Sequence, residues 1–209
     1  MLESRIASTS PDRASGEQLE VVPVDIFQPL SFATIFQNTL PVEVDLGSGP
    51  GRFLIEAASQ YPQRNFLGVE RLLGRVRKTL RSACRLGLTN VRVLRVEIDY
   101  TVRYLLSPES VFRLHLSFPD PWPKRRHHRR RLVDHEFLTA SAAALVSGGE
   151  LWIKTDHADY FNCISKVVGT RKGLFVPIPW SEEYPITDFE ETYRAQNLPI
   201  YQLRLRKVN

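Results

Sequence analysis

Residues 42–60, VEVDLGSGPGRFLIEAASQ, form the stretch that decides the fold. Residues 42–46 are predicted to be a buried strand and residues 52–60 a helix. The segment 47–51 between them breaks the strand, because glycine adopts backbone conformations that other residues avoid. Glycines also let a ligand approach the backbone closely, and the start of the following helix offers unpaired N–H groups. The turn is therefore a candidate ligand-binding site.

Strands and helices alternate along most of the remaining chain. Residues 201–206 alternate apolar and polar side chains, which is typical of a strand with one wet face, antiparallel and near a sheet edge. This order predicts an α/β sandwich with a mainly parallel sheet. Apolar periodicity predicts further strands at 65–70, 91–96, 111–118 and 150–155, and helices at 72–85, 100–106, 132–146 and 158–168.

The composition favours one soluble domain. The chain has 209 residues, 43% of them hydrophobic, enough for one substantial core. We expect residues 1–20 to be a loose arm and residues 21–209 to be a single domain. No apolar run has membrane-spanning length and no signal peptide is recognisable, so we expect a cytoplasmic protein without a membrane partner. Cys84, Cys163 and the five histidines lack metal-ligand spacing, so no metal is expected.

A short basic run accounts for the positive net charge. The chain carries 28 Lys and Arg against 23 Asp and Glu, and residues 124–131, KRRHHRRR, contribute six of the cations and no acid. Without this run the chain is close to neutral, which indicates a local footprint for a polyanion, with nucleic acid as the first candidate. A solvated charged loop is the plainer alternative.

One carboxylate stands directly before the basic run, in residues 117–124, SFPDPWPK. Asp120 lies between two of the three prolines in this segment. Because proline fixes φ and lacks an N–H group, the segment cannot continue a helix or a central strand. A carboxylate on a stiff loop beside many cations suggests a site that grips a polyanion while one polar group orients part of it.

Acids follow several of the predicted strands. Ligands of parallel sheets bind beyond the carboxyl ends of the strands, so we expect these side chains to lie close together. The glycine spacing departs from the dinucleotide fingerprint, and no phosphate-loop lysine follows. Glu70 is placed to accept hydrogen bonds from ribose hydroxyls, and Glu97, with Asp99 as its competitor, to flank an adenine ring. The acids at the predicted strand ends are Asp45, Glu70, Glu97 and Asp120.

From residue 40 to residue 207 the chain resembles the bacterial tRNA (guanine-N7-)-methyltransferases. The motifs that carry the resemblance are FPDPWPK at 118–124 with the basic residues after it, KTD at 154–156 and TDFE at 187–190. The resemblance implies a single Rossmann-like class I methyltransferase domain. Its sheet would have seven mostly parallel strands, helices on both faces and an antiparallel strand near the C-terminal edge. It also implies S-adenosylmethionine as cofactor and transfer RNA as substrate, methylated at N7 of a guanosine in the variable loop (m7G46).

The resemblance also implies a role for individual residues. Asp120 matches the residue assigned to catalysis. Two positions depart from the family, which usually has Glu in place of Asp45 and Asp or Asn in place of Glu97. Positions that match cofactor contacts are Asp45, Gly47, Gly49, Glu70, Glu97 and Asp120. Substrate contacts match Lys124, Asp156, Thr187, Asp188, Phe189 and Glu190, and RNA contacts match Arg125, Arg126, His127, His128, Arg129, Arg130 and Arg131.

Such a methyl transfer does not require a strong general base. Guanine N7 carries an in-plane lone pair, so catalysis depends on alignment and on carboxylates that offset the positive charge of the methylated base. We expect Asp120 to orient base and cofactor, and Asp156 or Glu190 to bind the guanine edge. The base would unstack into the pocket, against aromatic side chains. The candidate stacking residues are Trp122, Phe189 and Tyr193.

Two other functions use parts of the same pattern. Another class I methyltransferase, acting on a protein or a small molecule, would need the glycine turn and Glu70 but not residues 124–131. A non-catalytic RNA-binding module would need the basic run but not the acids at the strand ends. The sequence leaves the oligomeric state open between monomer and homodimer.

Overall fold

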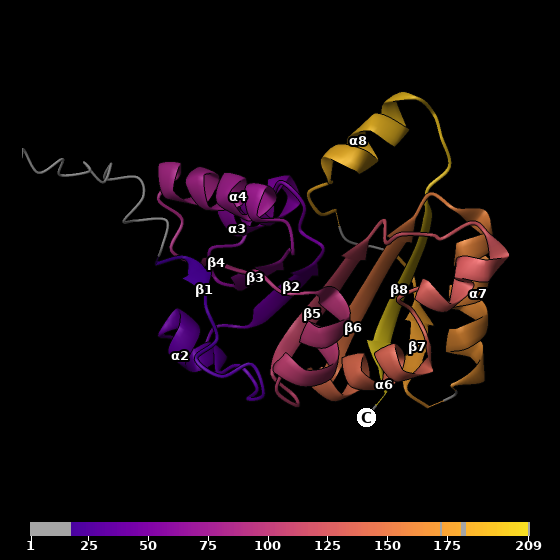
Figure 1. The fold of residues 1–209 in the computed structure, drawn as a ribbon, viewed down its shortest axis with the longest axis horizontal. Helices are drawn as coiled ribbons and strands as arrows, with labels where there is room; N and C mark the ends of the chain where they lie inside the picture. Colours follow the sequence, from indigo (N-terminus) through magenta and orange to yellow (C-terminus); the bar gives the residue numbers. More distant parts are fainter. Residues whose placement is uncertain (1–17, 172, 181–182, 209) are drawn as a thin grey trace, which may run out of the picture.

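A single eight-stranded sheet organises the chain, in the order β1-β4-β3-β2-β5-β6-β8-β7. The computed structural model describes residues 18–171, 173–180 and 183–208 (Figure 1). The strands are β1 (Glu20–Val21), β2 (Val42–Leu46), β3 (Asn65–Val69), β4 (Val91–Leu94), β5 (Val111–Ser117), β6 (Leu145–Thr155), β7 (Phe175–Ile178) and β8 (Tyr201–Lys207).

Helices lie on both faces of this sheet, as predicted (Figure 1). None of the helices in the described ranges is long and apolar enough to cross a membrane. They are α2 (Phe32–Phe36), α3 (Arg52–Gln60), α4 (Leu73–Arg85), α5 (Ile98–Tyr100), the π-helical turn η1 (Thr101–Leu105), the 3-10 helix η2 (Arg125–Arg130), α6 (His135–Ala144), α7 (Ala158–Thr170) and α8 (Asp188–Ala195).

The strand pairing confirms a mainly parallel α/β sheet. Strands β1 to β6 run parallel to one another, whereas β8 is antiparallel to both β6 and β7. The two-residue β1, which pairs with β4, brings the total to eight strands instead of the expected seven. Leu19 is buried and Glu20 begins β1, while residues 1–17 of the expected arm lie outside the described residues.

One predicted helix is shorter than expected. The helix predicted over 132–146 begins at His135, where the Asp134 side chain accepts a hydrogen bond from the Phe137 N–H group at 2.7 Å. It ends at Ala144, because Leu145 already pairs with Val111 as part of β6. Gly148 and Gly149 therefore lie within β6, and the pairing of β6 with β5 shifts register between Val111 and Arg113.

Two apolar cores fix the helices against the sheet. The larger core packs α2, η1, α6 and α7 on one face, with Val44, Leu114 and Leu151 fully buried. The smaller core packs α3 and α4 on β3 and β4 of the other face, around Leu54 and Val76. Because both cores consist of contiguous buried side chains, they hold the central strands, and with them their carboxyl ends, in place.

The second face is polar where it continues over β5, β6 and β8. Glu43 accepts hydrogen bonds from Arg64 at 2.5 Å, His115 at 2.7 Å and Tyr184 at 2.8 Å. Burial opposes ionisation of Glu43, but the hydrogen bond from His115 and the charge of Arg113 lower its pKa to about 2. This buried ionic layer joins β2 to β5 near the amino end of β2, where Glu43 lies opposite Arg113.

Candidate active site

The acids at the strand ends lie on the same side of the sheet, at the carboxyl ends of β2, β3, β4 and β5, because these strands are parallel. Asp45 occupies the penultimate position of β2 and Glu70 follows the last residue of β3, and both side chains are buried. Burial, reinforced by the negative charge of Glu70, raises the pKa of Asp45 to about 7.

The glycine turn needs glycine for both conformation and space. Gly47, Gly49 and Gly51 have φ angles of +87°, +55° and +87°, a region that side chains disfavour. A Cβ atom on Gly51 would lie 2.3 Å from Thr79 Oγ1, so this glycine lets α3 and α4 approach each other. Helix α3 starts at this turn without a side-chain cap, which leaves its first N–H groups available to a ligand.

A cleft of about 390 Å³ opens beside this turn. It joins three segments that are far apart in the sequence: the glycine turn, the proline-rich loop after β5 and the start of α8. Six of the predicted site residues lie on its walls. The lining residues are Gly47, Gly49, Pro50, Arg52, Phe53, Arg75, Ser117, Phe118, Asp120, Thr187, Asp188 and Phe189.

The proline-rich loop holds Asp120 in a strained but well-anchored backbone. Phe118 and Trp122 have φ angles of +54° and +43°, which are costly for bulky side chains. The Phe118 N–H group donates to the Lys154 carbonyl at 2.8 Å, and Arg131 donates to the Pro121 carbonyl at 2.8 Å. Strain that neighbouring contacts maintain is typical of functional loops, and here it presents an exposed carboxylate to the cleft.

Aromatic rings stand next to Asp120. The ring centroid of Phe189 lies 4.8 Å from that of Phe118 and 4.7 Å from that of Tyr193. The Tyr193 hydroxyl donates to Asp156 Oδ2 at 2.7 Å. Two of the three predicted stacking residues, Phe189 and Tyr193, therefore gather with Phe118 beside the cleft.

The third predicted stacking residue, Trp122, lies under the basic run instead. The Arg130 guanidinium is 5.0 Å from its ring centroid, and the ring of His127 meets it edge-on at 5.8 Å. Trp122 therefore packs against the basic segment.

Helix α8 is fastened to the sheet by a buried ion pair. Lys154 Nζ lies 2.7 Å from Glu190 Oε2, and Arg194 donates to Glu190 Oε1 at 2.5 Å. Glu190 is only 1% exposed, so both of its oxygens are engaged within the protein. Of the two acids expected to bind the guanine edge, Glu190 holds α8, whereas Asp156 is bonded through Oδ2 alone in the described structure.

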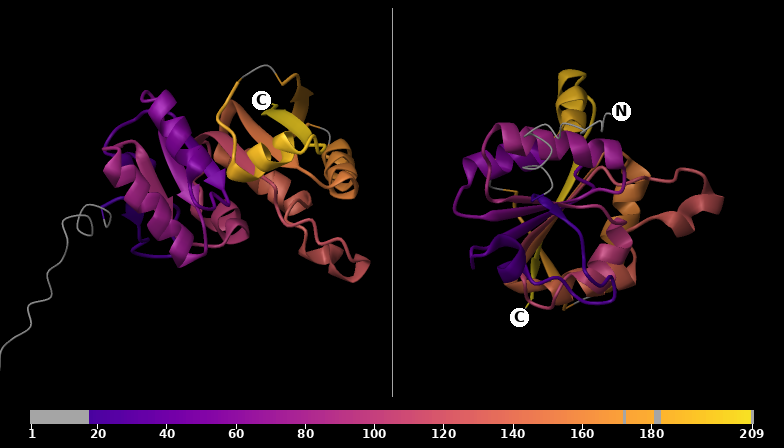
Figure 2. Two further views of the ribbon diagram at one scale, coloured as in Figure 1. Left: turned by 90° about the horizontal axis from the view of Figure 1, so that it is seen from above. Right: turned by 60° about the vertical axis from the view of Figure 1, so that its left-hand side comes forward.

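The basic run forms an arm that projects from the body. Residues 124–131, which we call the basic arm, include η2 and appear as the coral projection in the right-hand view of Figure 2. Arg131 differs from the other cations: its side chain is 6% exposed and bonds to Asp159 at 2.6 Å. It anchors the arm to α7. The exposed cations of the arm are Lys124, Arg125, Arg126, Arg129 and Arg130, with His127 and His128 half-buried between them.

Glu97 and Asp99 lie at the start of α5, close to the glycine turn. A Cβ atom on Gly47 would be 3.2 Å from Ile98, so this segment closes against the turn. The Asp99 carboxylate is 2.6 Å from Arg103, whereas the Glu97 side chain is 68% exposed with Arg71 at 3.8 Å. Asp99 is thus already paired, and Glu97 is the more accessible of the two for a ligand.

Two arginines in the cleft escaped the sequence interpretation. Arg52 bonds to Glu56 on its own helix and to Asp188 and Glu191 on α8, so it ties the two walls of the cleft together. Arg75 lines the cleft and lies 3.5 Å from Glu70. The only available signal for Arg52 was its place directly after the glycine turn. Among the residues that the structure describes, no group of His, Cys, Asp and Glu is arranged to hold a metal ion.

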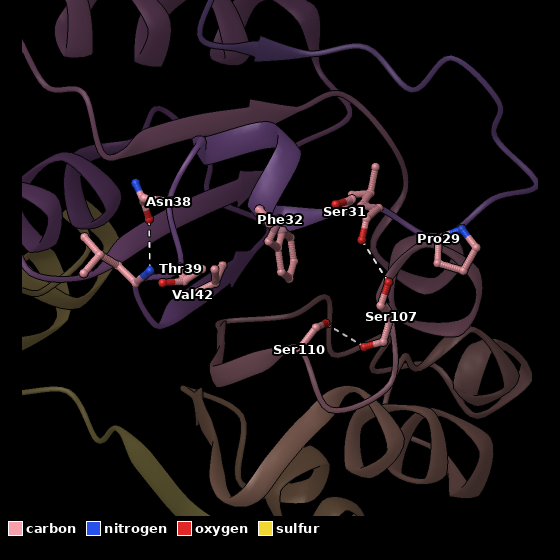
Figure 3. A pocket seen from close by; sticks show the side chains of 11 residues that line it. Pro29, Ser31, Phe32, Asn38, Thr39, Val42, Ser107 and Ser110 are labelled. Atoms are coloured by element: carbon pink, nitrogen blue, oxygen red, sulfur yellow. Dashed lines mark hydrogen bonds between the residues drawn. The ribbon is translucent and has the colours of Figure 1, made fainter.

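A second hollow, of about 400 Å³, lies on the side of the sheet where the amino ends of the strands are (Figure 3). Val42 and Ser110, at the amino ends of β2 and β5, line it together with Pro29 and Phe32. The hydroxyl groups of Ser31, Ser107 and Ser110 bond to nearby protein oxygens; Ser110, for example, donates to the Ser107 carbonyl at 2.6 Å. None of the 11 residues on its walls is ionisable, whereas the first cleft is lined by two arginines and two aspartates.

Comparison with known proteins agrees with this arrangement. A family model described as a putative methyltransferase matches residues 39–203. The tRNA (guanine-N(7)-)-methyltransferase of Syntrophotalea carbinolica is 34% identical over 184 residues, which cover 86% of this chain and 79% of that protein. The corresponding protein of Leifsonia xyli is 36% identical over 190 residues, 86% of this chain and 82% of its own length.

Solved structures share the fold at lower identity. The 16S rRNA methyltransferase KamB superposes with a TM-score of 0.62 at 16% identity, over 87% of this chain and 96% of that one. An rRNA methylase from Streptococcus thermophilus superposes with a TM-score of 0.56 at 15% identity, over 97% and 99% of the two chains. A Rossmann-like methyltransferase fold and two relatives above 30% identity agree with each other. The chain belongs to the family of tRNA (guanine-N(7)-)-methyltransferases.

Proposed function

We propose that the protein transfers the methyl group of S-adenosylmethionine to N7 of a guanosine in transfer RNA, in the variable loop at m7G46. The observation that carries the proposal is the cleft in which the glycine turn, Asp120 and the start of α8 meet. The names of the relatives support the base, the atom and the class of RNA. One structural neighbour, a 16S rRNA (adenine(1408)-N(1))-methyltransferase from Catenulisporales acidiphilia, contains SAM as cosubstrate, which supports the methyl donor.

The residues at the glycine turn fit this donor. Ser48 Oγ is buried at the turn and has no hydrogen-bond partner within the described ranges. Glu70 keeps acceptor capacity for ribose hydroxyls, since one oxygen accepts only the Leu72 N–H group at 2.8 Å and the other faces Arg75 at 3.5 Å. Asp45 and Glu97 complete the acidic edge. When bound, S-adenosylmethionine supplies an electrophilic methyl group on a positively charged sulfur.

The protein's own residues supply position and charge. Because guanine N7 attacks through a lone pair that is already free, no side chain has to remove a proton first. Asp120, on its rigid loop between glycine turn and α8, orients the base and offsets the positive charge that the base gains. Asp156 accepts hydrogen bonds from the guanine edge, and Phe189 with Tyr193 stacks on the unpaired base. Positioning by a rigid site accounts for most of the rate in this proposal.

The basic arm holds the RNA outside the cleft. Its exposed cations follow the Asp120 loop directly, so phosphates bound to the arm place the neighbouring nucleotide near the carboxylate. Each phosphate contact contributes a salt-dependent share of the affinity. Arg131 acts within the protein, because it fixes the arm to α7 through Asp159.

Methylation of unmodified transfer RNA with labelled S-adenosylmethionine tests the proposal. The product is mapped by chain cleavage specific for N7-methylguanosine, and we expect a single cut in the variable loop. The Asp120→Asn variant should lose turnover on the order of 100-fold or more, since an electrostatic and orienting group is removed. Glu109→Gln is the matched control, because this carboxylate is 71% exposed and precedes β5 at the opposite edge of the sheet. Label at another ring atom, or near wild-type turnover in Asp120→Asn, would contradict the proposal.

A further inference from the structure

Helix α4 carries a second basic surface, separate from the basic arm. Residues 71–96 contain eight Lys and Arg residues and no Asp or Glu. Of the 28 cations in the chain, six lie in the basic arm and eight in this segment. The remainder of the chain therefore has only 14 cations and all 23 acids. The positive charge is therefore concentrated at two places, not one.

Four of these cations form what we call the α4 stripe: Arg77, Lys78, Arg81 and Arg85. All four are exposed, and none makes an ion pair with any described residue. Arg77, Arg81 and Arg85 follow each other at intervals of four residues, about 6 Å along the helix, on one face. The stripe is therefore a row of unneutralised guanidinium and ammonium groups at regular spacing.

The stripe works against the stability of its own helix. Like charges four residues apart destabilise a helix by roughly 0.2–0.5 kcal/mol per pair. The opposite, apolar face of α4 already packs Val76 and Leu80 on the sheet, so the helix does not present an apolar face to a membrane. Bound anions would remove the repulsion and gain charge-assisted hydrogen bonds. A polyanion with evenly spaced charges fits this row best.

The position of the stripe relates it to the cleft. Helix α4 begins just after Glu70, and Arg75 in its first turns lines the cleft. From there the stripe continues away from the cleft along α4, on the upper left of Figure 1, whereas the basic arm projects on the other side in the right-hand view of Figure 2. A ligand that touches both must be much larger than one nucleotide, as a folded RNA is.

We propose that the α4 stripe binds the phosphate backbone of the RNA substrate, at a distance from the methylated guanosine. This inference rests on the proposed function and adds to it a second contact surface. The stripe would let the enzyme distinguish a complete folded RNA from a fragment that carries only the target loop. The chemistry at the guanosine would not depend on it.

The test compares two double variants with the same change in charge. Arg81→Gln/Arg85→Gln removes two cations of the stripe, and Lys166→Gln/Arg171→Gln removes two exposed cations at the end of α7, near the opposite edge of the sheet. Dissociation constants for a full-length unmodified tRNA transcript are measured from 50 to 400 mM NaCl, together with kcat and KM. A short stem–loop transcript with the target guanosine serves as the second substrate.

For the stripe variant we expect the salt slope to fall by about 1.4–1.8, the value for two lost phosphate contacts. If those contacts contribute nothing at 1 M salt, KM for full-length tRNA rises roughly 25- to 60-fold at 0.1 M salt. Its kcat on full-length tRNA at saturation and its activity on the stem–loop stay at the wild-type level. Its thermal midpoint does not fall and rises slightly, because like-charge pairs in α4 are removed. The α7 control keeps the wild-type salt slope.

An unchanged salt slope in the stripe variant, with an active wild-type enzyme, would overturn this inference alone. An equal loss on the stem–loop and on full-length tRNA would also overturn it, because the stripe would then act at the guanosine. Binding of the wild-type protein, but not the stripe variant, to phosphatidylserine vesicles with no change in RNA binding would assign the stripe to a membrane surface. Failure of the proposed function looks different, since the wild-type protein itself would not methylate tRNA.

Discussion

The buried pair of Lys154 and Glu190 should decide whether α8 stays on the sheet. We consider the substitution Lys154→Met, which keeps the length of the side chain but removes its charge. Lys154 is 8% exposed and Glu190 1%, and their charged atoms are 2.7 Å apart. In the variant, a buried carboxylate would keep Arg194 as its remaining partner.

Removing one partner of a buried ion pair typically costs about 3–5 kcal/mol. Arg194 still donates to Glu190 at 2.5 Å, which offsets part of the loss. We therefore expect destabilisation of about 2–3 kcal/mol. For a domain of this size, that corresponds to a fall in the thermal midpoint of roughly 4–12 °C. Because α8 carries Thr187, Asp188 and Phe189 into the cleft, methyl transfer should fall as well.

The companion variant Lys154→Met/Glu190→Leu distinguishes a role of Glu190 in holding α8 from a role in binding the substrate. Replacing both charges by apolar groups is often neutral or stabilising, so the double variant should return to within about 1 kcal/mol of the wild type. Arg194 is 56% exposed and can be solvated without its partner. If Glu190 only fastens α8, the double variant also regains most of its methyl transfer.

Thermal and denaturant unfolding measure the stability, and labelled methyl transfer to tRNA measures the activity. A midpoint for Lys154→Met within 2 °C of the wild type, well below the roughly 4–12 °C expected, would refute the assigned strength of the pair. A double variant less stable than Lys154→Met would refute the charge argument itself. Recovery of stability without recovery of activity would show that Glu190 contacts the substrate.

Three further predictions concern other parts of the site. Asp45 has its pKa raised to about 7 in the folded protein, above its value in an unfolded chain, so folding stability falls as pH rises from about 4 to about 7. Relative to Asp45→Asn, the wild type should lose about 2–3 kcal/mol between pH 5 and pH 8 in denaturant titrations, and parallel curves would contradict this. Gly51→Ala should lower the stability by about 2–4 kcal/mol, because Gly51 has φ +87° and the new Cβ would lie 2.3 Å from Thr79 Oγ1. Gly87→Ala, at φ +64° and with open space around it, should lower the stability by only about 1 kcal/mol. Equal thermal midpoints of the two variants would exclude the packing explanation. Arg131→Gln should increase tryptic cleavage of the basic arm several-fold in mass-spectrometric time courses, because the arm loses its bonds to Pro121 and Asp159, and an unchanged cleavage rate would show that it is anchored elsewhere.

Local patterns were enough to predict the glycine turn and the acids around it. Residues 42–51 specify a buried strand and a turn by themselves, and the structure places Gly47 and Gly49 in left-handed conformations there. Parallel topology then brings Glu70 beside Asp45 without further information. The proline-rich loop was equally local, because three prolines dictate its stiffness.

The walls of the cleft depended on contacts between distant residues. Arg52 and Asp188 are 136 residues apart, and nothing near either residue in the sequence specifies their pairing. Glu190 was expected to contact the substrate. Its burial could not be predicted from the sequence, because it depends on the pairing with Lys154, which is far away in the chain. The burial of Arg113 on β5 likewise depends on distant partners, because Glu43 on β2 and Glu150 on β6 lie across from it.

Both edges of the eight-stranded sheet are unsuited to pairing with another strand. On one side β1 offers only two residues, and on the other the four-residue β7 contains Pro177, which has no N–H group to donate. Long, regular edges invite aggregation through strand addition, and neither edge here is long or regular. Association between copies through the described edges of the sheet is therefore disfavoured, and helices or loops are the surfaces that we expect it to use.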